Sequence, residues 1–131
     1  MIVDTSAIVA ILRDEPEAAS CAAAIASAKT CRVSAVNYVE AAAVIDGSRN
    51  HITSRRFDEL FREAGLRIEP VTEAQARIAR EAYRDFGKGS GHAAGLNFGD
   101  CFAYALAKAT GEPILFKGND FRHTDLTPVL E

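Results

Sequence analysis

Four acidic residues stand where a carboxylate is expected to do chemistry rather than to solvate the surface. Asp4 and Asp120 each follow a short apolar run that reads as a buried strand. Glu40 and Asp100 lie in predicted helices, with mostly apolar neighbours three and four residues away. A carboxylate that packs inward is costly unless it is paired, hydrogen-bonded or bound to a cation. No Lys or Arg is placed three or four residues from Glu40 to pair with it.

The four acids are expected to meet at one edge of a parallel sheet, where ligands bind outside the carboxyl ends of the strands. Carboxylates gathered there repel one another, and a divalent cation relieves that repulsion. Oxygen ligands favour Mg²⁺ or Mn²⁺ over zinc, and such ions serve phosphoryl chemistry by activating water and neutralising phosphate charge. Each acid also has a plainer reading: Asp4 and Asp100 as helix N-terminal residues, Asp120 as a turn residue, and Glu40 as a side chain that reaches solvent or a distant Arg.

The elements that must position these acids alternate between short strands and helices. Strands are predicted at 2–4, 32–34, 66–71, 113–116 and 126–129, and helices at 7–12, 17–29, 35–45, 53–64, 72–86 and 99–111. Residues 117–125 are expected to form a loop or short helix. Alternating strands and helices predict an α/β fold, with a parallel sheet between helical layers. A length of 131 residues predicts a single domain, residues 1–131.

The composition excludes several classes of protein. With 48% hydrophobic residues and a net charge of -3, the chain is neither a disordered tail nor a broadly basic nucleic-acid coat protein. No stretch is long and apolar enough to predict a membrane span, and no basic leader precedes an apolar region, so a cytoplasmic location is expected. The three cysteines form no CxxC pair, which argues against a disulfide framework and a structural zinc site.

A glycine-rich stretch and Lys117 each suggest a different function. The stretch 87–91 is rich in glycine, but it lacks the spacing of a phosphate-binding loop and follows a helix, so a mobile loop is expected, with Lys88 as a phosphate contact. Lys117, at the end of an apolar strand, is similar to a residue of receiver signalling domains. A receiver also needs a phospho-accepting Asp after its third strand, and residues 68–71 provide none.

Four segments together resemble the PIN-domain toxins of the VapC type. They are the opening Met1–Ala7, the helix region Ser34–Ala41, the segment Gly95–Ala107, and Leu115–Phe121 with Thr124–Asp125. They span essentially the whole chain in order. The resemblance implies a three-layer α/β/α PIN-like fold with a mostly parallel sheet of about five strands.

The resemblance also implies a Mg²⁺- or Mn²⁺-dependent endoribonuclease. Asp4, Glu40 and Asp100 match the three core acids that hold the metal, and the fourth acidic position falls on Asp120, with Asn119 beside it. Ser6 resembles the hydroxyl residue that often supports such a site. A water activated at the metal would attack the scissile phosphodiester and leave a 5′-phosphate and a 3′-hydroxyl. RNA is expected to be steered by basic side chains, with Lys88, Lys117, Arg49, Arg55 and Arg56 as candidates.

The partners implied are an RNA substrate, a second copy of the chain in a homodimer, and a VapB-type antitoxin that blocks the site and alone contacts promoter DNA. No membrane partner is expected. Two alternatives stay open: a catalytically silent PIN-like module that only binds a partner, and a receiver-like phosphoacceptor domain. The net charge is no obstacle to RNA, because removing the four site acids from the 18 acidic residues leaves 14 against 15 basic ones.

Overall fold

The structure of the chain, a computed structural model, describes residues 1–130. Along the chain the strands are β1 (Ile2–Val3), β2 (Arg32–Ser34), β3 (Arg67–Glu69) and β4 (Ile114–Leu115). The helices are α1 (Thr5–Leu12), α2 (Ala18–Ser27), α3 (Ala35–Gly47), α4 (His51–Glu63), α5 (Glu73–Phe86) and α6 (Phe98–Thr110), followed by the 3₁₀ helix η1 (Asp120–His123).

The four strands form one parallel sheet in the order β3-β2-β1-β4. All carboxyl ends therefore point to the same edge, as predicted. The fifth strand expected at 126–129 is reduced to an isolated bridge between Ile114 and Pro128, held by Ile114 N–H to the Thr127 carbonyl (3.0 Å) and Val129 N–H to the Ile114 carbonyl (2.9 Å). Thr127 and Val129 make both bonds, so the amide position of Pro128 faces the outer edge, where proline is tolerated. The sheet has four strands where about five were predicted.

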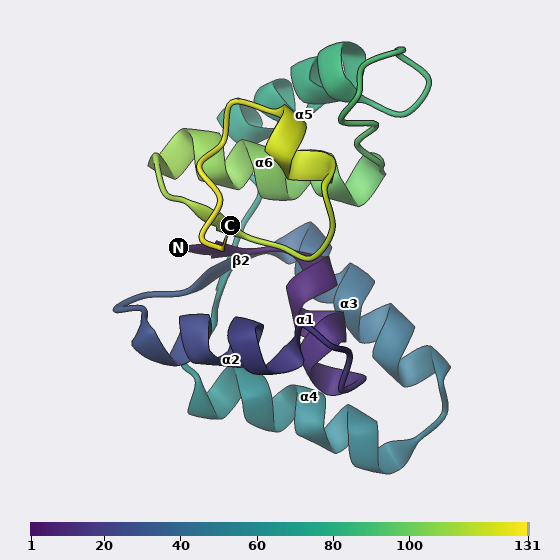
Figure 1. Cartoon of the computed structure of the whole chain (residues 1–131), viewed down its shortest axis with the longest axis vertical. Helices are drawn as coiled ribbons and strands as arrows, with labels where there is room; N and C mark the ends of the chain where they lie inside the picture. Colours follow the sequence, from purple (N-terminus) through teal and green to yellow (C-terminus); the bar gives the residue numbers. More distant parts are fainter. Residues whose placement is uncertain (131) are drawn as a thin grey trace.

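Helices cover both faces of the sheet, which confirms the three-layer α/β/α architecture (Figure 1). Side chains alternate along each strand, so Ile2 and Ile114 pack with α5 and α6, while Val3 and Leu115 pack with α1, α2, α3 and α4. Strands β1 and β4 are apolar on both faces and fully buried, whereas the edge strand β3 is largely exposed. This double core fixes the sheet edge from which the acids project.

Most element boundaries differ from the predicted ones by one or two residues. Helix α1 begins at Thr5 rather than at residue 7, because the side chain of Asp4 caps it by accepting from the Ser6 N–H. Helix α6 ends at Gly111, whose φ of 72° suits glycine. Cys21, Cys31 and Cys101 are free and buried, as predicted. Within residues 1–130, no helix combines the length and apolarity that crossing a membrane requires.

Candidate active site

Asp4 stands at the carboxyl end of β1 and is only 2% exposed. Its Oδ2 accepts hydrogen bonds from the Ser6 backbone N–H (3.0 Å) and the Ser6 hydroxyl (2.6 Å). Its Oδ1 is buried and has no hydrogen-bond partner among residues 1–130. One oxygen thus serves as a helix cap, and the other is a buried acceptor left without a donor, which is costly in a folded protein.

Glu40 reaches the same region from α3 and is held by donors from two helices. Thr5, the residue after Asp4, donates its hydroxyl to Glu40 Oε1 at 2.5 Å. The fully buried Asn37 donates its amide to Glu40 Oε1 (3.4 Å), to the Thr5 hydroxyl (3.1 Å) and to the Gly99 carbonyl (3.0 Å). A Cβ at Gly99 would collide with the Glu40 carboxylate, so a side chain at position 99 would displace that carboxylate from its present place.

Asp100 lies in the first turn of α6 and is 9% exposed. It forms a capping box with Asn97: the Asn97 side chain accepts from the Asp100 N–H (2.8 Å), and Asp100 Oδ2 accepts from the Asn97 N–H (3.0 Å). The plainer reading of Asp4 and Asp100 as helix N-terminal residues is therefore correct as far as it goes. It accounts for one oxygen of each carboxylate.

The loop after β4 brings Asp120, Asn119 and Lys117 to this edge. Asp120 is exposed at the start of η1, and its charge acts on Asp100. Asn119 precedes it and makes no side-chain cap to η1. The Lys117 backbone N–H donates to the Ser6 hydroxyl at 2.9 Å. Ser6 therefore links the loop after β4 to Asp4.

Asp4, Glu40, Asp100 and Asp120 form what we call the acidic cluster. Burial raises the pKa of Asp4 to about 6, against the Ser6 hydrogen bonds, and the charge of Glu40 adds to the rise. Burial, then the charge of Asp4, raises the pKa of Asp100 to about 7, with Asp120 and Glu40 acting in the same direction. No Lys, Arg or His among residues 1–130 forms an ion pair with any of the four.

The carboxylates face protein donors in this arrangement. In the described part of the chain, no three Asp, Glu, His or Cys side chains are placed so that they could hold a metal ion together as they stand. The donor set is nevertheless oxygen only, mutually repelling, without a counter-ion and with one orphaned buried oxygen. That set fits a hard divalent cation, provided that side chains turn from their present partners.

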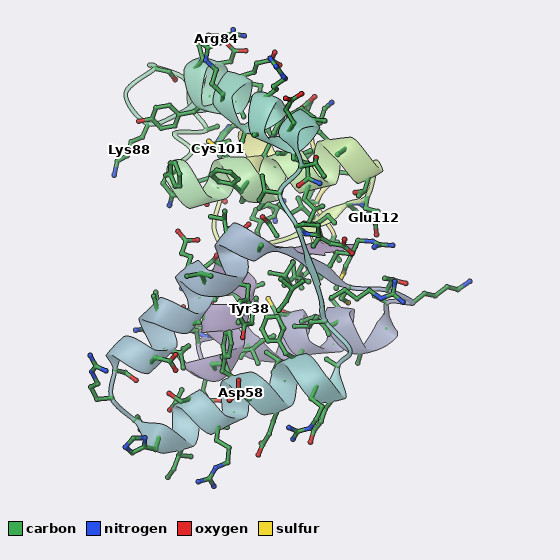
Figure 2. All side chains as sticks on the ribbon, turned by 180° about the vertical axis from the view of Figure 1, so that it is seen from behind. Tyr38, Asp58, Arg84, Lys88, Cys101 and Glu112 are labelled. Carbon is green, nitrogen blue, oxygen red and sulfur yellow. The ribbon has the colours of Figure 1, made fainter. Side chains whose placement is uncertain are left out.

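The predicted basic residues are only partly gathered near the acids. Lys117 pairs with Glu15 and so contributes its backbone N–H rather than a free ammonium group. Arg56 of α4 pairs with Asp14 at 3.6 Å. Arg49 and Arg55 are exposed, on the loop before α4 and on α4 itself, which lies at the opposite end of the molecule from α5 (Figure 1). Lys88 projects from the loop after α5, near α6 (Figure 2).

Thr5, Asn37 and Gly99 were missed by sequence reasoning as residues of this site. Their signals were a hydroxyl beside Asp4, an amide one turn before Glu40 within an apolar helix, and a glycine immediately before Asp100. Each signal is common in surface helices and turns. Only the meeting of α1, α3 and α6 gives them a shared role.

Comparison with known proteins shows which family this chain resembles. The model of the PIN domain family matches residues 1–126. Ribonuclease VapC28 of Mycobacterium tuberculosis is 59% identical over 131 residues, covering 100% of this chain and 98% of that protein. Ribonuclease VapC42 of the same species is 50% identical over 128 residues and covers 98% of each chain.

Solved structures show the same fold at lower identity. Mycobacterium tuberculosis VapC20, described as a sarcin–ricin loop cleaving toxin, has a TM-score of 0.78 at 17% identity, covering 98% of this chain and 97% of that one. FitAcB from Neisseria gonorrhoeae has a TM-score of 0.70 at 22% identity, covering 97% and 94%. A toxin–antitoxin complex from Klebsiella pneumoniae has a TM-score of 0.68 at 15% identity, covering 92% and 88%.

Proposed function

This chain belongs to the PIN-domain family, among the VapC ribonucleases, and from that premise we propose that it is a Mg²⁺- or Mn²⁺-dependent endoribonuclease that hydrolyses RNA phosphodiester bonds. Membership of this family excludes the receiver-like alternative. The observation that carries the proposal is the acidic cluster itself. Four carboxylates lie at one sheet edge with no Lys, Arg or His of residues 1–130 in an ion pair with them, and two have raised pKa values. Carboxylates perturbed by burial and by one another are typical of functional sites, and a divalent cation would relieve their repulsion.

Asp4, Glu40 and Asp100 are the residues proposed to hold the metal, with Asp120 in support. When bound, a divalent cation supplies a Lewis acid that lowers the pKa of water and neutralises charge that develops on the phosphate. Asp4 offers its unpartnered Oδ1 without losing the cap that its Oδ2 provides to α1. Asp100 likewise keeps its capping bond through Oδ2. A nearby backbone N–H therefore holds one oxygen of each carboxylate in place, that of Ser6 for Asp4 and that of Asn97 for Asp100.

Glu40 differs from Asp4 and Asp100 because, within residues 1–130, only side chains, those of Thr5 and Asn37, donate hydrogen bonds to its carboxylate. These bonds fix the direction from which Glu40 approaches Asp4 and Asp100. Ser6 ties Asp4 to the loop that carries Asn119 and Asp120, so this loop is positioned with the metal ligands. Such supporting contacts orient ligating carboxylates and tune metal affinity.

The proposal includes the partners of a toxin. A VapB-type antitoxin would silence the site by placing a cationic side chain among the four acids, where residues 1–130 provide none in an ion pair. Contact with promoter DNA would run through the antitoxin alone. We also propose a homodimer and a cytoplasmic location, in keeping with an RNA substrate.

The test is an RNA cleavage assay on the purified chain with Mg²⁺, with Mn²⁺ and with EDTA, beside Asp4→Asn. Cleavage by the wild type that needs the metal and is lost in Asp4→Asn is the expected result. Cleavage that survives EDTA, or is undiminished in Asp4→Asn, would contradict the site. If no RNA is cut under any metal condition, the chain is a silent PIN-like binding module instead.

A further inference from the structure

A groove of about 640 Å³ runs between α5 and α6 and plays no part in the metal site proposed above. Its walls carry an unusual combination of side chains for a protein surface. The chemically distinctive ones are Arg80, Tyr83, Arg84, Lys88, Phe98 and Phe102. None of the residues that line it is acidic, although the chain as a whole has a net charge of -3.

The aromatic side chains in this groove are open to solvent. Phe98 is 70% exposed and Tyr83 is 49% exposed. Phe98 packs against Phe102, with ring centroids 5.0 Å apart, which holds one ring beside the other. Burying such surfaces is favourable, so a groove with two exposed rings is a binding surface rather than ordinary solvated surface.

Basic side chains make the groove positively charged. Arg84 pairs with Asp85 at 2.8 Å, whereas Arg80 and Lys88 form no ion pair among residues 1–130. Figure 2 shows Arg84 and Lys88 at the same end of the molecule, with Cys101 of α6 close by. Aromatic residues and arginine are enriched in protein interfaces as well, but lysine is depleted there. A positive groove that combines lysine and arginine with aromatic platforms is typical of single-stranded nucleic-acid binding.

The groove adjoins the acidic cluster at Asn97. Asn97 lines it, and the backbone N–H of Asn97 donates to Asp100 Oδ2 at 3.0 Å. Phe98, the next residue, is therefore two positions from Asp100 at the start of the same helix. A strand whose phosphodiester lies at Asp100 has its neighbouring nucleotides at the mouth of this groove.

We propose that the α5–α6 groove binds unpaired RNA nucleotides that flank the scissile phosphodiester. Their bases stack on Phe98 and Tyr83, and their phosphates meet Arg80 and Lys88. The inference rests on the proposed function, because it names the substrate class of that same site. Stacking on an aromatic face accepts any base, so the groove selects single strands over duplexes rather than a sequence.

Binding can be measured without cleavage, which separates the two proposals. The full-length chain in EDTA is titrated into a fluorescein-labelled single-stranded oligoribonucleotide, and into the same strand annealed to its complement, with anisotropy as the readout. We expect the single strand to bind more tightly than the duplex. Phe98→Ala and Tyr83→Ala should each weaken single-strand binding by roughly 5- to 100-fold. Phe98→Tyr, which keeps an aromatic ring, should bind the single strand like the wild type, whereas Phe98→Leu, which has no ring, should bind it as weakly as Phe98→Ala.

Matched controls come from exposed residues outside the groove. Ile52 on α4 is 67% exposed, and Ile52→Ala should bind RNA as the wild type does. Arg77 lies on α5 but does not line the groove, so Arg77→Gln should change the affinity less than Arg80→Gln. Arg80→Gln should also lower the slope of log affinity against log salt by about 1, as expected for one lost phosphate contact. Thermal unfolding confirms that each variant is folded.

The inference is overturned if Phe98→Ala and Tyr83→Ala bind single-stranded RNA like the wild type, or if Phe98→Leu binds as tightly as Phe98→Tyr. It is also overturned if the variants change only the oligomeric state in size-exclusion chromatography, since the groove would then join two copies of the chain. If the wild type cuts RNA while the groove variants bind normally, the proposed function stands without the groove. If the wild type cuts no RNA but binds single strands through Phe98, the groove stands and the proposed function fails.

Discussion

Glu112, at the amino end of β4, is paired with cations, whereas the acidic cluster at the carboxyl ends of the strands is not. Glu112, just before β4, accepts from the Met1 ammonium group (2.8 Å) and from Arg32 Nε (3.0 Å). Arg32, the first residue of β2, also forms an ion pair at 2.7 Å with Glu69, the last residue of β3. Burial pushes the pKa of Glu112 up, but the ammonium group and Arg32 outweigh it, so its pKa lies below the usual value. Glu112 and Lys88 lie on opposite sides of the molecule (Figure 2).

The acidic cluster differs from Glu112 in burial, in hydrogen-bond partners and in the direction of the pKa shift. Asp4 is more buried than Glu112, has only neutral donors, and has a pKa of about 6. Asp100 faces other carboxylates and has a pKa of about 7. The two ends share a sheet and a core, so the difference comes from the residues placed there. The amino end of β4 has its acid neutralised by cations of the chain, and the carboxyl ends keep carboxylates whose repulsion a proton or an added cation relieves.

The largest expected contrast between the two ends is in catalysis. Asp100→Asn should lower the rate of metal-dependent RNA cleavage by roughly 1000-fold, because it removes a charged ligand from the proposed metal site. Glu112→Gln should leave the rate within about two-fold, because it acts at the other edge of the sheet. Single-turnover cleavage of a labelled RNA measures both. An equal loss of cleavage rate in Asp100→Asn and Glu112→Gln would contradict the assignment of catalysis to the acidic cluster.

A smaller effect is expected when the support of the acidic cluster is removed. Ser6→Ala deletes the hydroxyl that donates to Asp4 and accepts from the Lys117 N–H. We expect roughly 10- to 100-fold weaker Mn²⁺ binding in a calorimetric titration, the range typical of residues that orient metal ligands. Ser20→Ala is the matched control, since Ser20 is exposed on α2 and its hydroxyl bonds only the Glu17 carbonyl. Unchanged affinity in Ser6→Ala would show that the link to Asp4 is dispensable.

The two ends should also respond oppositely to pH in the absence of metal. A raised pKa means that folded Asp4 and Asp100 hold protons that the unfolded chain has released, so their contribution to stability is lost as pH rises from about 4 to 7. Urea unfolding in EDTA should therefore show falling stability over that range, by roughly 3 kcal/mol for Asp4. Asp4→Asn should make the curve shallower, because Asp100 still titrates in the variant. A wild-type curve already flat between these pH values would contradict the raised pKa values.

The smallest effect concerns the paired end. Because the pKa of Glu112 is lowered, its contribution is present above the unfolded pKa and is lost as pH falls through the folded value. Glu112→Gln should cost about 1 kcal/mol of unfolding free energy at neutral pH, since the pair is partly exposed. A stabilised Glu112→Gln would show that the pairing at this end is not favourable.

Much of this arrangement follows from residue types alone. The apolar runs before Asp4 and Asp120 predicted strands, and parallel strands bring their carboxyl ends to one edge. The segment predicted as a fifth strand does lie beside β4, but it pairs at the single bridge between Ile114 and Pro128. The support of Glu40 could not be predicted, since Asn37 binds the carbonyl of Gly99, 62 residues away. Arg49, Arg55 and Arg56 were chosen by charge, and charge alone does not tell which end of the molecule a helix covers.

The most direct test of the difference between the two ends is a calorimetric titration of Mn²⁺ into the wild type, Asp100→Asn and Glu112→Gln. If the acidic cluster is a metal site, the wild type and Glu112→Gln bind Mn²⁺ with the same affinity. Asp100→Asn should bind it at least about ten-fold more weakly. Binding by Asp100→Asn as tight as that of the wild type would contradict the assignment, because the metal would then be held elsewhere on the molecule.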